Sequence, residues 1–331
     1  MNWSDRTILV TGGTGSFGKK FTEIVLNRYK PKKLIIFSRD EFKQSEMAKA
    51  YPDCQYPIRY FLGDIRDKDR LCRAFEGVDY VVHAAALKQV PALEYNPTEA
   101  VKTNVVGADN IVDAAIDKGV KKVIALSTDK AVIPINLYGA TKLSAEKIFI
   151  AANAYAGGRV IFSVVRYGNV VGSRGSVVPF FLNLKKQNLK EFPITDERMT
   201  RFWITLQQGV ELVIRSLQEA EGGEVFVPMI PSMRVVDLAK AIEPECTFKI
   251  IGVRPGEKVN ETLISEDEAR TTKIYNGIFV ILPPTVPREN AYEKYEKYPS
   301  VTEGFTYRSD KNDKWLSIAE LREILKGVEI E

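Results

Sequence analysis

The sequence has little cysteine and almost no histidine. Its three cysteines, Cys54, Cys72 and Cys246, are odd in number and far apart, and His83 is its one histidine. A structural zinc site draws about four ligands from closely spaced Cys and His residues, so we expect no metal site. The absence of a Cys-x-x-Cys pair and the odd count suit a reducing compartment.

Long hydrophobic runs are also missing. No uninterrupted apolar stretch approaches the roughly 18 residues that a transmembrane helix needs. The first residues lead into a strand without the apolar region of a signal peptide. We therefore expect a soluble, cytoplasmic protein that does not engage a membrane.

A large excess of one charge is the third absence. The chain has 47 lysine and arginine residues against 43 aspartates and glutamates, a formal net charge of +4, and the two signs are interleaved. Nucleic-acid-binding proteins concentrate positive charge, so we expect no nucleic-acid partner, whereas small anionic substrates are compatible with this balance. With 331 residues, 45% of them hydrophobic, the chain can bury a large core.

What the chain does contain is a regular alternation of apolar strands and amphipathic helices. We expect strands at 7–10, 33–37, 59–62, 80–83, 122–126 and 160–165, and helices at 17–29, 45–51, 68–75, 97–117 and 138–154. Continuously apolar strands joined by helices indicate a parallel sheet covered on both faces. The pattern predicts an α/β protein with a doubly wound parallel sheet of the Rossmann type.

After about residue 170 this alternation gives way to shorter elements. We expect helices at 177–186, 206–219, 235–242 and 321–325, and strands at 201–204 and 224–227. The change predicts a dinucleotide-binding domain at 1–170, with 205–230 returning to it. Residues 171–204 and 231–331 would form a smaller mixed α/β substrate lobe.

The turn after the first strand has the glycine spacing of a dinucleotide site. Gly13, Gly15 and Gly18 fit Gly-x-Gly-x-x-Gly, and Gly12 with the last two fits Gly-x-x-Gly-x-x-Gly. Glycines allow close approach of the backbone to phosphate, and the helix that follows offers free N–H groups. A plain glycine-rich turn is the alternative, but the position between strand and helix favours a nicotinamide dinucleotide. The contacts expected from this turn are Gly12, Thr14, Gly15, Ser16, Phe17 and Gly18.

The end of the second strand discriminates between the two nicotinamide cofactors. An acid there would bind the ribose 2′-hydroxyl, but this chain has Ser38 and Arg39, followed by Asp40. A hydroxyl and a guanidinium suit a 2′-phosphate, so NADP is favoured, with a solvated surface charge as the alternative for Arg39. Further cofactor contacts are expected at later strand ends, from Asp64, Ile65, Ala84, Ala85 and Ala86.

Tyr138 and Lys142 form a Tyr-x-x-x-Lys pair at the start of a helix. The i,i+4 spacing puts both side chains on one face. A nearby ammonium favours phenolate, so Lys142 is expected to lower the pKa of Tyr138 towards the working pH. This spacing is usually structural, but downstream of a dinucleotide turn it indicates chemistry, with both residues touching the cofactor.

The fifth strand ends in Ser127-Thr128-Asp129-Lys130. Carboxyl ends of strands in such sheets face the ligand crevice. Thr128 can hydrogen-bond a substrate hydroxyl, while Asp129 and Lys130 are an acid and a potential base. A local ion pair is the structural alternative, although buried charges are costly unless paired or used. His83, at another strand end, is expected to be a packed core residue.

Several of these strings resemble a known family. The turn 11–18, the Tyr138/Lys142 pair and Asn104 resemble the extended short-chain dehydrogenases/reductases, in which Asn104 would also contribute to the cofactor site. More specific strings look like the inverting UDP-N-acetylglucosamine 4,6-dehydratases, and the likeness covers essentially the whole chain. These are residues 127–131, 167–176, 199–203 and 254–258.

The resemblance implies a redox-neutral lyase reaction on UDP-N-acetylglucosamine. Tyr138, assisted by Lys142, would take the proton of the 4-hydroxyl while C4 gives a hydride to NADP. Lys130 would remove the C5 hydrogen, protonated Asp129 would help the C6 hydroxyl leave as water, and the hydride would return to C6. The product, inverted at C5, starts the route to pseudaminic acid, which decorates flagellin and other surface glycans. A homo-oligomer is implied as well.

The same resemblance gives the substrate contacts. They are expected to be Lys88, Asn169, Val177, Arg201, Arg254 and Glu257. Glu261 is an alternative to Glu257 at the ribose, and a surface salt bridge is the structural alternative for the charged members of this set.

Two other functions fit part of the pattern. A UDP-sugar 4-epimerase uses the same tyrosine–lysine pair but needs neither Asp129 nor Lys130. A non-enzymatic NADP-sensing protein has no use for the pair at all. Related membrane-anchored dehydratases that retain the C5 configuration lack the tyrosine, so the presence of Tyr138 favours inversion.

Overall fold

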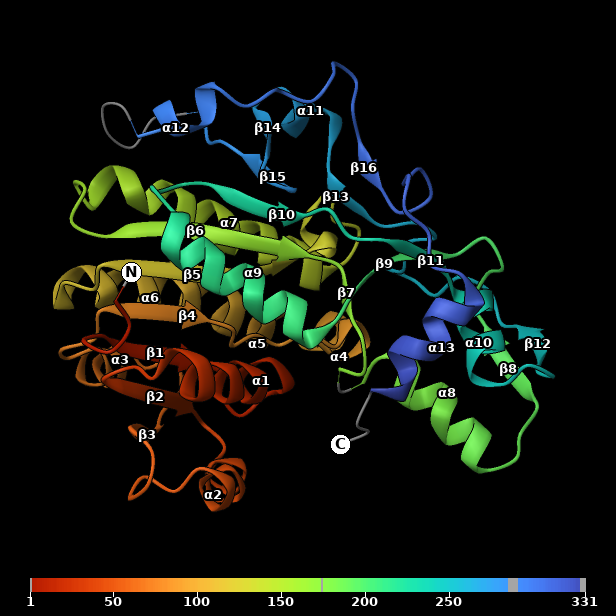
Figure 1. The fold of residues 1–331 in the computed structure, drawn as a ribbon, viewed down its shortest axis with the longest axis horizontal. Coiled ribbons are helices and arrows are strands. Elements are labelled where there is room, and N and C mark those ends of the chain that lie inside the picture. Colours follow the sequence, from red (N-terminus) through yellow and green to blue (C-terminus); the bar gives the residue numbers. More distant parts are fainter. Residues whose placement is uncertain (1, 174, 285–290, 328–331) are drawn as a thin grey trace.

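The computed structural model describes residues 2–173, 175–284 and 291–327. Arg174, within the 167–176 string, lies outside the described residues. A nine-stranded sheet runs through the centre in the order β14-β15-β10-β6-β5-β4-β1-β2-β3 (Figure 1). Its strands are β1 (Thr7–Thr11), β2 (Lys33–Ser38), β3 (Ile58–Leu62), β4 (Tyr80–His83), β5 (Lys122–Thr128), β6 (Ile161–Tyr167), β10 (Val225–Pro228), β14 (Thr272–Tyr275) and β15 (Ile278–Ile281).

Neighbouring strands from β3 to β10 all pair in parallel, whereas β15 runs antiparallel to β10 and to β14. The central strands β1 and β4 are buried along their whole length because helices cover both faces. The prediction of a doubly wound α/β sheet is confirmed.

Helices flank this sheet. They are α1 (Ser16–Ile24), α2 (Glu41–Ala50), α3 (Lys68–Ala74), α4 (Val90–Tyr95), α5 (Pro97–Val101), α6 (Gly107–Lys118), α7 (Leu137–Tyr155) and α9 (Leu206–Glu219). Helices α1 and α9 pack together on one face, and α3, α6 and α7 pack side by side on the other (Figure 1). Single π-helical stretches, η1 (Val25–Tyr29) and η2 (Lys102–Val106), continue α1 and α5.

A second group of elements lies beside the carboxyl ends of the strands. It contains β7 (Asn169–Val170), α8 (Val177–Lys186), β8 (Glu191–Ile194), β9 (Thr200–Ile204), β11 (Ser232–Arg234), α10 (Val235–Ile242), β12 (Thr247–Ile250) and α13 (Ile318–Lys326). These elements share a hydrophobic cluster of their own, including Phe181, Trp203 and Leu238. The ribbon β13 (Thr262–Ile264) and β16 (Tyr307–Arg308), with α11 (Glu266–Ala269) and α12 (Glu293–Glu296), completes the described chain.

Several elements differ from the sequence-based expectation. The helix expected at 45–51 begins at Glu41, because the Asp40 side chain accepts a hydrogen bond from the Lys43 backbone N–H (2.9 Å) and caps it. The helix expected at 97–117 is interrupted by η2, and α4 was not expected.

The sheet also takes in more of the chain than expected. Strands β14 and β15 come from the stretch 231–331, so that stretch does not lie wholly in a separate lobe. From 205–230, α9 covers the sheet and β10 joins it. The exact division into two domains stays a prediction.

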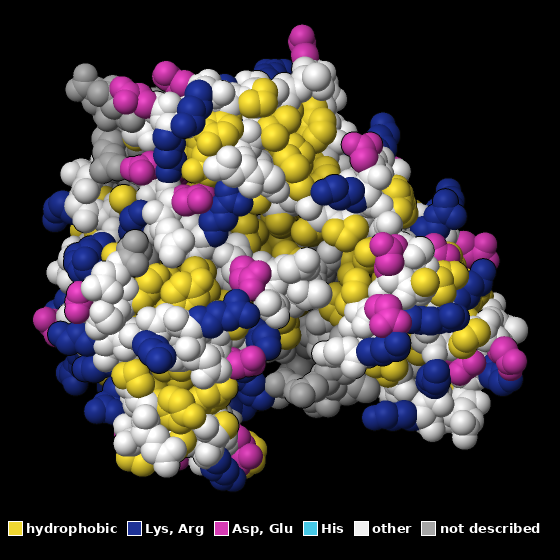
Figure 2. Space-filling view, viewed as in Figure 1, with side chains coloured by type: hydrophobic (Ala, Val, Ile, Leu, Met, Phe, Trp, Pro, Cys, Tyr) yellow, Lys and Arg dark blue, Asp and Glu magenta, His cyan; other side chains and the backbone are white. Residues whose placement is uncertain are grey.

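Charged side chains of both signs are interspersed across the face shown in Figure 2, which is notched between the sheet and the lobe that carries α8 and α13. Within the described residues, none of the helices has both the length and the apolar character needed to cross a bilayer.

A buried ion cluster ties β6 to α7 and to the C-terminal part. Arg166 on β6 donates two hydrogen bonds to Glu146 on α7 (3.1 and 2.6 Å) and two to Glu268 on α11 (3.1 and 2.9 Å). A fifth goes to the carbonyl of Leu263 (2.9 Å). The Arg166 side chain is 1% exposed. Because every one of these donors is used, the cluster fixes the helix that carries Tyr138 against the sheet.

Replacing Arg166 with methionine is expected to lower the free energy of unfolding by about 3–5 kcal/mol, because Glu146 would be left buried without its cation. Chemical denaturation followed by circular dichroism measures the loss. The matched control is Arg198→Met, which removes an arginine whose ion pair with Asp196 lies on the surface. Equal losses in both variants would contradict the role of burial.

Candidate active site

A cleft of about 660 Å³ opens at the carboxyl ends of the parallel strands. Such edges collect the loops that bind ligands in open α/β sheets, and the volume suits a small-molecule site. The cleft is lined by most of the predicted residues: Gly12, Thr14, Gly15, Ser16, Phe17, Ser38, Arg39, Asp64, Ile65, Ala84, Ala85, Ala86, Lys88, Thr128, Lys130, Tyr138, Lys142 and Asn169.

The glycine turn leaves room for a phosphate-bearing ligand. Gly12 has φ +65°, and a Cβ there would lie 2.9 Å from the backbone of Ala85. A Cβ on Gly18, which packs behind the turn, would lie 2.3 Å from the Gly13 carbonyl oxygen. Helix α1 begins after Gly15 with no side-chain cap, so its first N–H groups are open to a ligand. These features fit a dinucleotide pyrophosphate.

Four buried polar atoms on the cleft wall have no hydrogen-bond partner within the part of the chain that the structure describes. They are Thr103 Oγ1, Ser127 Oγ, Asn169 Oδ1 and Ser176 Oγ. An unsatisfied buried polar atom costs about 1–3 kcal/mol, so a polar ligand is the natural partner for this wall. Of the four residues only Asn169 was predicted, because an isolated hydroxyl carries no signal in a sequence.

The cleft wall beside β2 carries paired charges. Arg39 and Lys43 line it together with Asp40 and Asp64, and Arg39 lies 3.8 Å from Asp64. Ser38 Oγ shares a hydrogen bond with Thr14 Oγ1 (2.8 Å). The carboxylate of Asp40 is engaged by the backbone N–H and the ammonium of Lys43 (2.9 and 2.5 Å). The acid at this strand end is therefore used to start α2. Lys43 was missed by the sequence analysis, although it stands three residues after Asp40.

Tyr138 and Lys142 lie at the start of α7, which Asn136 caps by accepting a hydrogen bond from Gly139 N–H (2.7 Å). Burial raises the pKa of Tyr138 to about 12, against the opposing effects of the Lys130 charge and a hydrogen bond with Thr128. Lys142 donates to the carbonyl of Leu126 (2.7 Å), and burial lowers its own pKa to about 8. The expectation that Lys142 lowers the Tyr138 pKa is wrong for this arrangement, because burial outweighs it.

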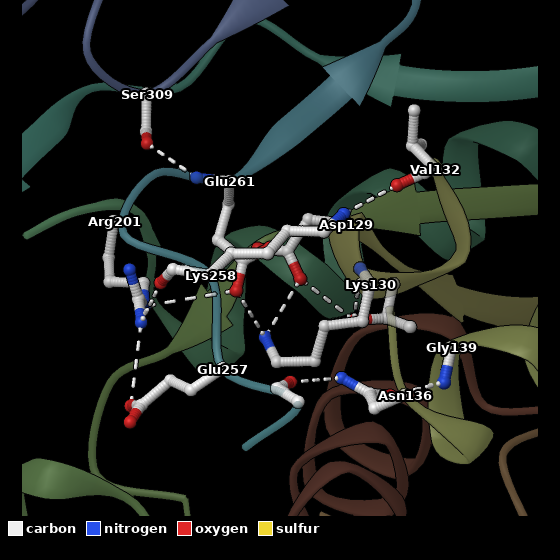
Figure 3. Close-up of polar contacts among 12 residues, drawn as sticks. Asp129, Lys130, Val132, Asn136, Gly139, Arg201, Glu257, Lys258, Glu261 and Ser309 are labelled. Atoms are coloured by element: carbon white, nitrogen blue, oxygen red, sulfur yellow. Dashed lines mark hydrogen bonds and ion pairs between the residues drawn. The ribbon is translucent and has the colours of Figure 1, made fainter. Parts of the chain in front are cut away.

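Asp129 and Lys130 form a buried ion cluster with Glu261 (Figure 3). Lys130 Nζ lies 3.0 Å from Asp129 Oδ1 and 3.2 Å from Glu261 Oε1, and the two carboxylates are 0% and 2% exposed. Burial raises the pKa of Asp129, and the charge of Glu261 adds to this. Burial works to lower the pKa of Lys130, but the two carboxylates reverse the effect and raise it. Lys130, which the sequence gave as a potential base, is thus an ammonium held between two acids.

Lys130 lines the cleft, whereas the predicted acid Asp129 is fully buried behind Thr128 and Lys130, outside the lining. Thr128 Oγ1 donates to Asp129 Oδ1 (3.0 Å), which leaves Asp129 Oδ2 without a partner among the described residues. Lys88 and Asn169 also line the cleft, and burial together with the Lys130 charge lowers the pKa of Lys88.

Other predicted contacts lie away from the cleft wall. Arg201 is buried and directs its guanidinium to the carbonyls of Thr200, Lys258 and Val259 (2.7, 3.0 and 2.9 Å), so it does not present free donors to a phosphate. Its Nη2 also lies 3.6 Å from Glu257 Oε1, and Glu257 is outside the cleft lining.

Three further predicted residues lie outside the cleft lining, and their contacts with substrate or cofactor stay predictions. Val177, at the start of α8, packs against the second hydrophobic cluster. Arg254 is exposed in a loop outside the cleft lining. Asn104 bonds the backbone N–H and carbonyl of Leu87 (both 2.9 Å) and Thr141 Oγ1 (3.0 Å), so it shapes the loop after β4 from behind. Residue type alone could not show where these side chains point.

His83 is buried and hydrogen-bonded through Nδ1 to Thr11 Oγ1 (2.9 Å), and burial lowers its pKa to about 3. It is therefore a neutral core residue. Within the described residues, no group of three or more His, Cys, Asp or Glu side chains is placed to hold a metal ion.

This geometry agrees with the chain's relatives. Residues 8–283 match the family described as "Polysaccharide biosynthesis protein". The chain belongs to this family. An inverting UDP-N-acetylglucosamine 4,6-dehydratase of Campylobacter jejuni is 52% identical over 99% of both chains. A UDP-glucose 4-epimerase of Rickettsia akari is 41% identical over 97% of this chain and 95% of its own.

Solved structures of the family's fold extend the comparison. The X-ray structure of Pen from Bacillus thuringiensis is 39% identical, covers 98% of each chain and superposes with a TM-score of 0.89. A dTDP-glucose 4,6-dehydratase, DesIV from Streptomyces venezuelae, with NAD and TYD bound, is 22% identical with a TM-score of 0.69, covering 76% of this chain and 86% of its own. The second likeness shows the shared fold alone.

Gly12→Ala is expected to weaken dinucleotide binding at least about tenfold, since the added methyl group would meet the Ala85 backbone and displace the turn. The matched control is Gly119→Ala. That glycine also has positive φ (+66°), but a Cβ there would meet nothing within 4 Å. Titration of NADPH by fluorescence measures both. Equal weakening in the two variants would show that general backbone strain is the cause.

Proposed function

We propose that this protein is an inverting UDP-N-acetylglucosamine 4,6-dehydratase. The product would be UDP-2-acetamido-2,6-dideoxy-β-L-arabino-hex-4-ulose. The observation that carries the proposal is the Asp129–Lys130 ion pair at the end of β5, whose two charges both act on Tyr138. Lys130, Tyr138 and Lys142 line the cleft together. The C. jejuni dehydratase, 52% identical over the same length, supports the same substrate.

The first half of the reaction is oxidation at C4. When bound, the nicotinamide dinucleotide supplies the hydride acceptor at C4 and the donor at C6. Tyr138 takes the proton of the 4-hydroxyl. Its high pKa in the protein makes the phenolate depend on nearby positive charge, which Lys130 provides, and on the hydrogen bond with Thr128. The 4-keto group then acidifies the C5 hydrogen.

The second half needs a neutral amine and a protonated carboxyl at the same time. One proton moving from Lys130 to Asp129, across a 3.0 Å contact, creates both from the ion pair. Burial favours this neutral form of the pair. Lys130 then takes the C5 hydrogen, and Asp129 gives its proton to the C6 hydroxyl. The C5–H and C6–O bonds break, water leaves, and the pair is again ionised. The C5=C6 double bond then takes up hydride at C6 and a solvent-derived proton at C5 on the opposite face, which completes the inversion.

The Rickettsia relative makes a UDP-sugar 4-epimerase the second candidate. An epimerase needs the oxidation step and therefore Tyr138 and Lys142. It breaks no bond at C5 or C6, so it has no use for a proton-sharing pair at the end of β5. A non-enzymatic NADP-sensing protein would use neither pair.

The cofactor in this proposal is NADP. Arg39 on the cleft wall, 3.8 Å from Asp64, is the cation that would meet a 2′-phosphate, while Asp40 is occupied by Lys43 and by capping α2. By likeness to the inverting dehydratases we extend the proposal to a cytoplasmic homo-oligomer. Its reaction would be the first step towards pseudaminic acid, used for flagellin glycosylation.

Incubation with UDP-N-acetylglucosamine in deuterated water is expected to give a 4-keto-6-deoxy sugar of L-arabino configuration that carries deuterium at C5. The deuterium enters because C5 is reprotonated from solvent-exchanged groups. Nuclear magnetic resonance of the sugar follows the reaction. A product that keeps its C6 hydroxyl and differs only at C4 would show an epimerase instead.

The matched variant for this test is Lys130→Ala. Its dehydration rate is expected to fall by about 10²–10⁴-fold, the usual contribution of a positioned base. Cofactor binding, measured by NADPH fluorescence, should persist because the glycine turn is untouched. Dehydration at the normal rate in Lys130→Ala would refute the assignment of the base.

Arg39→Ser is expected to weaken NADP binding by about 10- to 100-fold, the value of a charge-assisted hydrogen bond, and to change NAD binding little. Calorimetric titration with each dinucleotide measures the difference. Arg73→Ser, which removes an exposed arginine in the last turn of α3, outside the cleft lining, is the control. Equal loss of NADP and NAD affinity in Arg39→Ser would exclude a 2′-phosphate contact.

A further inference from the structure

Glu261 has no role in the proposed reaction steps, yet it is a buried acid with both backbone and side-chain contacts. It directly precedes β13, and its backbone N–H donates to Ser309 Oγ (2.9 Å) while its carbonyl accepts from Ser309 N–H (2.9 Å). Its side chain is 2% exposed, with Oε1 3.2 Å from Lys130 Nζ. Figure 3 shows the Glu261 carboxylate pointing towards the amino group of Lys130.

Arg201 stands behind this carboxylate. Its Nε lies 3.9 Å from Glu261 Oε1, and its other nitrogens bond the carbonyls of Thr200, Lys258 and Val259. These backbone contacts hold the guanidinium in place. Burial works to raise the pKa of Glu261, but Lys130, Arg201 and Lys258 together bring it below its usual range. Glu261 therefore stays ionised although it is buried.

We propose that Glu261 is a positioning residue, which holds the amino group of Lys130 between two carboxylates and directs the lysine proton to Asp129. The proposal deepens the dehydratase function and rests on it. A lysine side chain is long and flexible, so a single partner would leave its amine free to turn. Two carboxylates at 3.0 and 3.2 Å from Nζ fix it at the end of β5.

The choice between the two carboxylates follows from the charges around them. Lys130 and Lys258 act on both carboxylates, but Glu261 also faces Arg201, with Nε 3.9 Å from Oε1, whereas the charge of Glu261 repels that of Asp129. A proton leaving Lys130 therefore goes to Asp129. The other groups that act on Lys130 or respond to its charge are Lys88, beyond β4, and Tyr138 on α7.

The first test needs no substrate. The rate at which an acetylating reagent modifies Lys130 in the full chain is measured by peptide mass spectrometry at about pH 8 to 10, relative to exposed Lys147 on α7. Glu261→Gln keeps the shape but removes the charge. It is expected to raise the relative rate at least about tenfold, which corresponds to a pKa lower by one unit.

Glu261→Asp is the matched control. It opens more space at the lysine but keeps the charge, so a gain of only about two- to threefold is expected from the longer charge separation. Thermal unfolding first establishes that both variants fold. If Glu261→Gln does not fold, the labelling rate of Glu261→Asp alone tests the proposal. An unchanged rate in the variants that fold would overturn the proposal, and so would an equal tenfold gain in both, since exposure would then be the cause.

The second test uses UDP-N-acetylglucosamine. In Glu261→Gln we expect kcat to fall at least about tenfold with KM nearly unchanged, because a displaced base impairs only the step after oxidation. The absorbance of reduced nicotinamide should persist during turnover, since Tyr138 still acts at C4. Wild-type turnover in a folded Glu261→Gln variant would overturn the proposal. If the wild type itself does not dehydrate this sugar, the proposed function fails, whereas the labelling result still decides the role of Glu261.

Discussion

A carboxylate with no solvent contact needs a cation within hydrogen-bond reach, and Asp129 imposes this condition on the rest of the site. Its cation is Lys130, whose second partner is Glu261, which in turn faces Arg201. Charges of alternating sign thus connect the end of β5 to β9 and β13. Removing any one would leave a neighbour buried and uncompensated, at a cost of several kcal/mol. The chain of charges therefore fixes the second group of elements against the carboxyl ends of the sheet.

In the proposed reaction, the same chain of charges would let Lys130 act as a base although its pKa is raised. A lone buried lysine would become neutral through desolvation, but it would then have no acid beside it. The paired arrangement stores the proton on Lys130 and passes it to Asp129 when the base is needed. Forming the neutral pair costs about 1.4 kcal/mol for each unit by which the pKa of Lys130 exceeds that of Asp129. The reactive form is therefore a minor population. Both reactive groups then appear together, at adjacent positions of the backbone.

Local patterns in the sequence were enough to predict the parallel sheet and the cofactor turn, because apolar periodicity and glycine spacing act over a few residues. They failed where a distant contact decides the structure. Strands β14 and β15 join the sheet by antiparallel pairing with β10, which no local pattern announces. Arg201, which the family resemblance gave as a substrate contact, bonds three backbone carbonyls that no local pattern could have indicated. The anchoring of Lys130 by Glu261 likewise depends on folding.

The two buried ion clusters differ in one respect that separates structure from function. Around Arg166 all five donor contacts are made, to Glu146, Glu268 and a carbonyl, so the cluster has nothing left to offer a ligand. Around Lys130, one oxygen of Asp129 and one of Glu261 have no partner within the described residues. Proteins tolerate such incomplete hydrogen bonding where a substrate completes it. In the proposed reaction, the open oxygen of Asp129 would carry the proton for the leaving hydroxyl group.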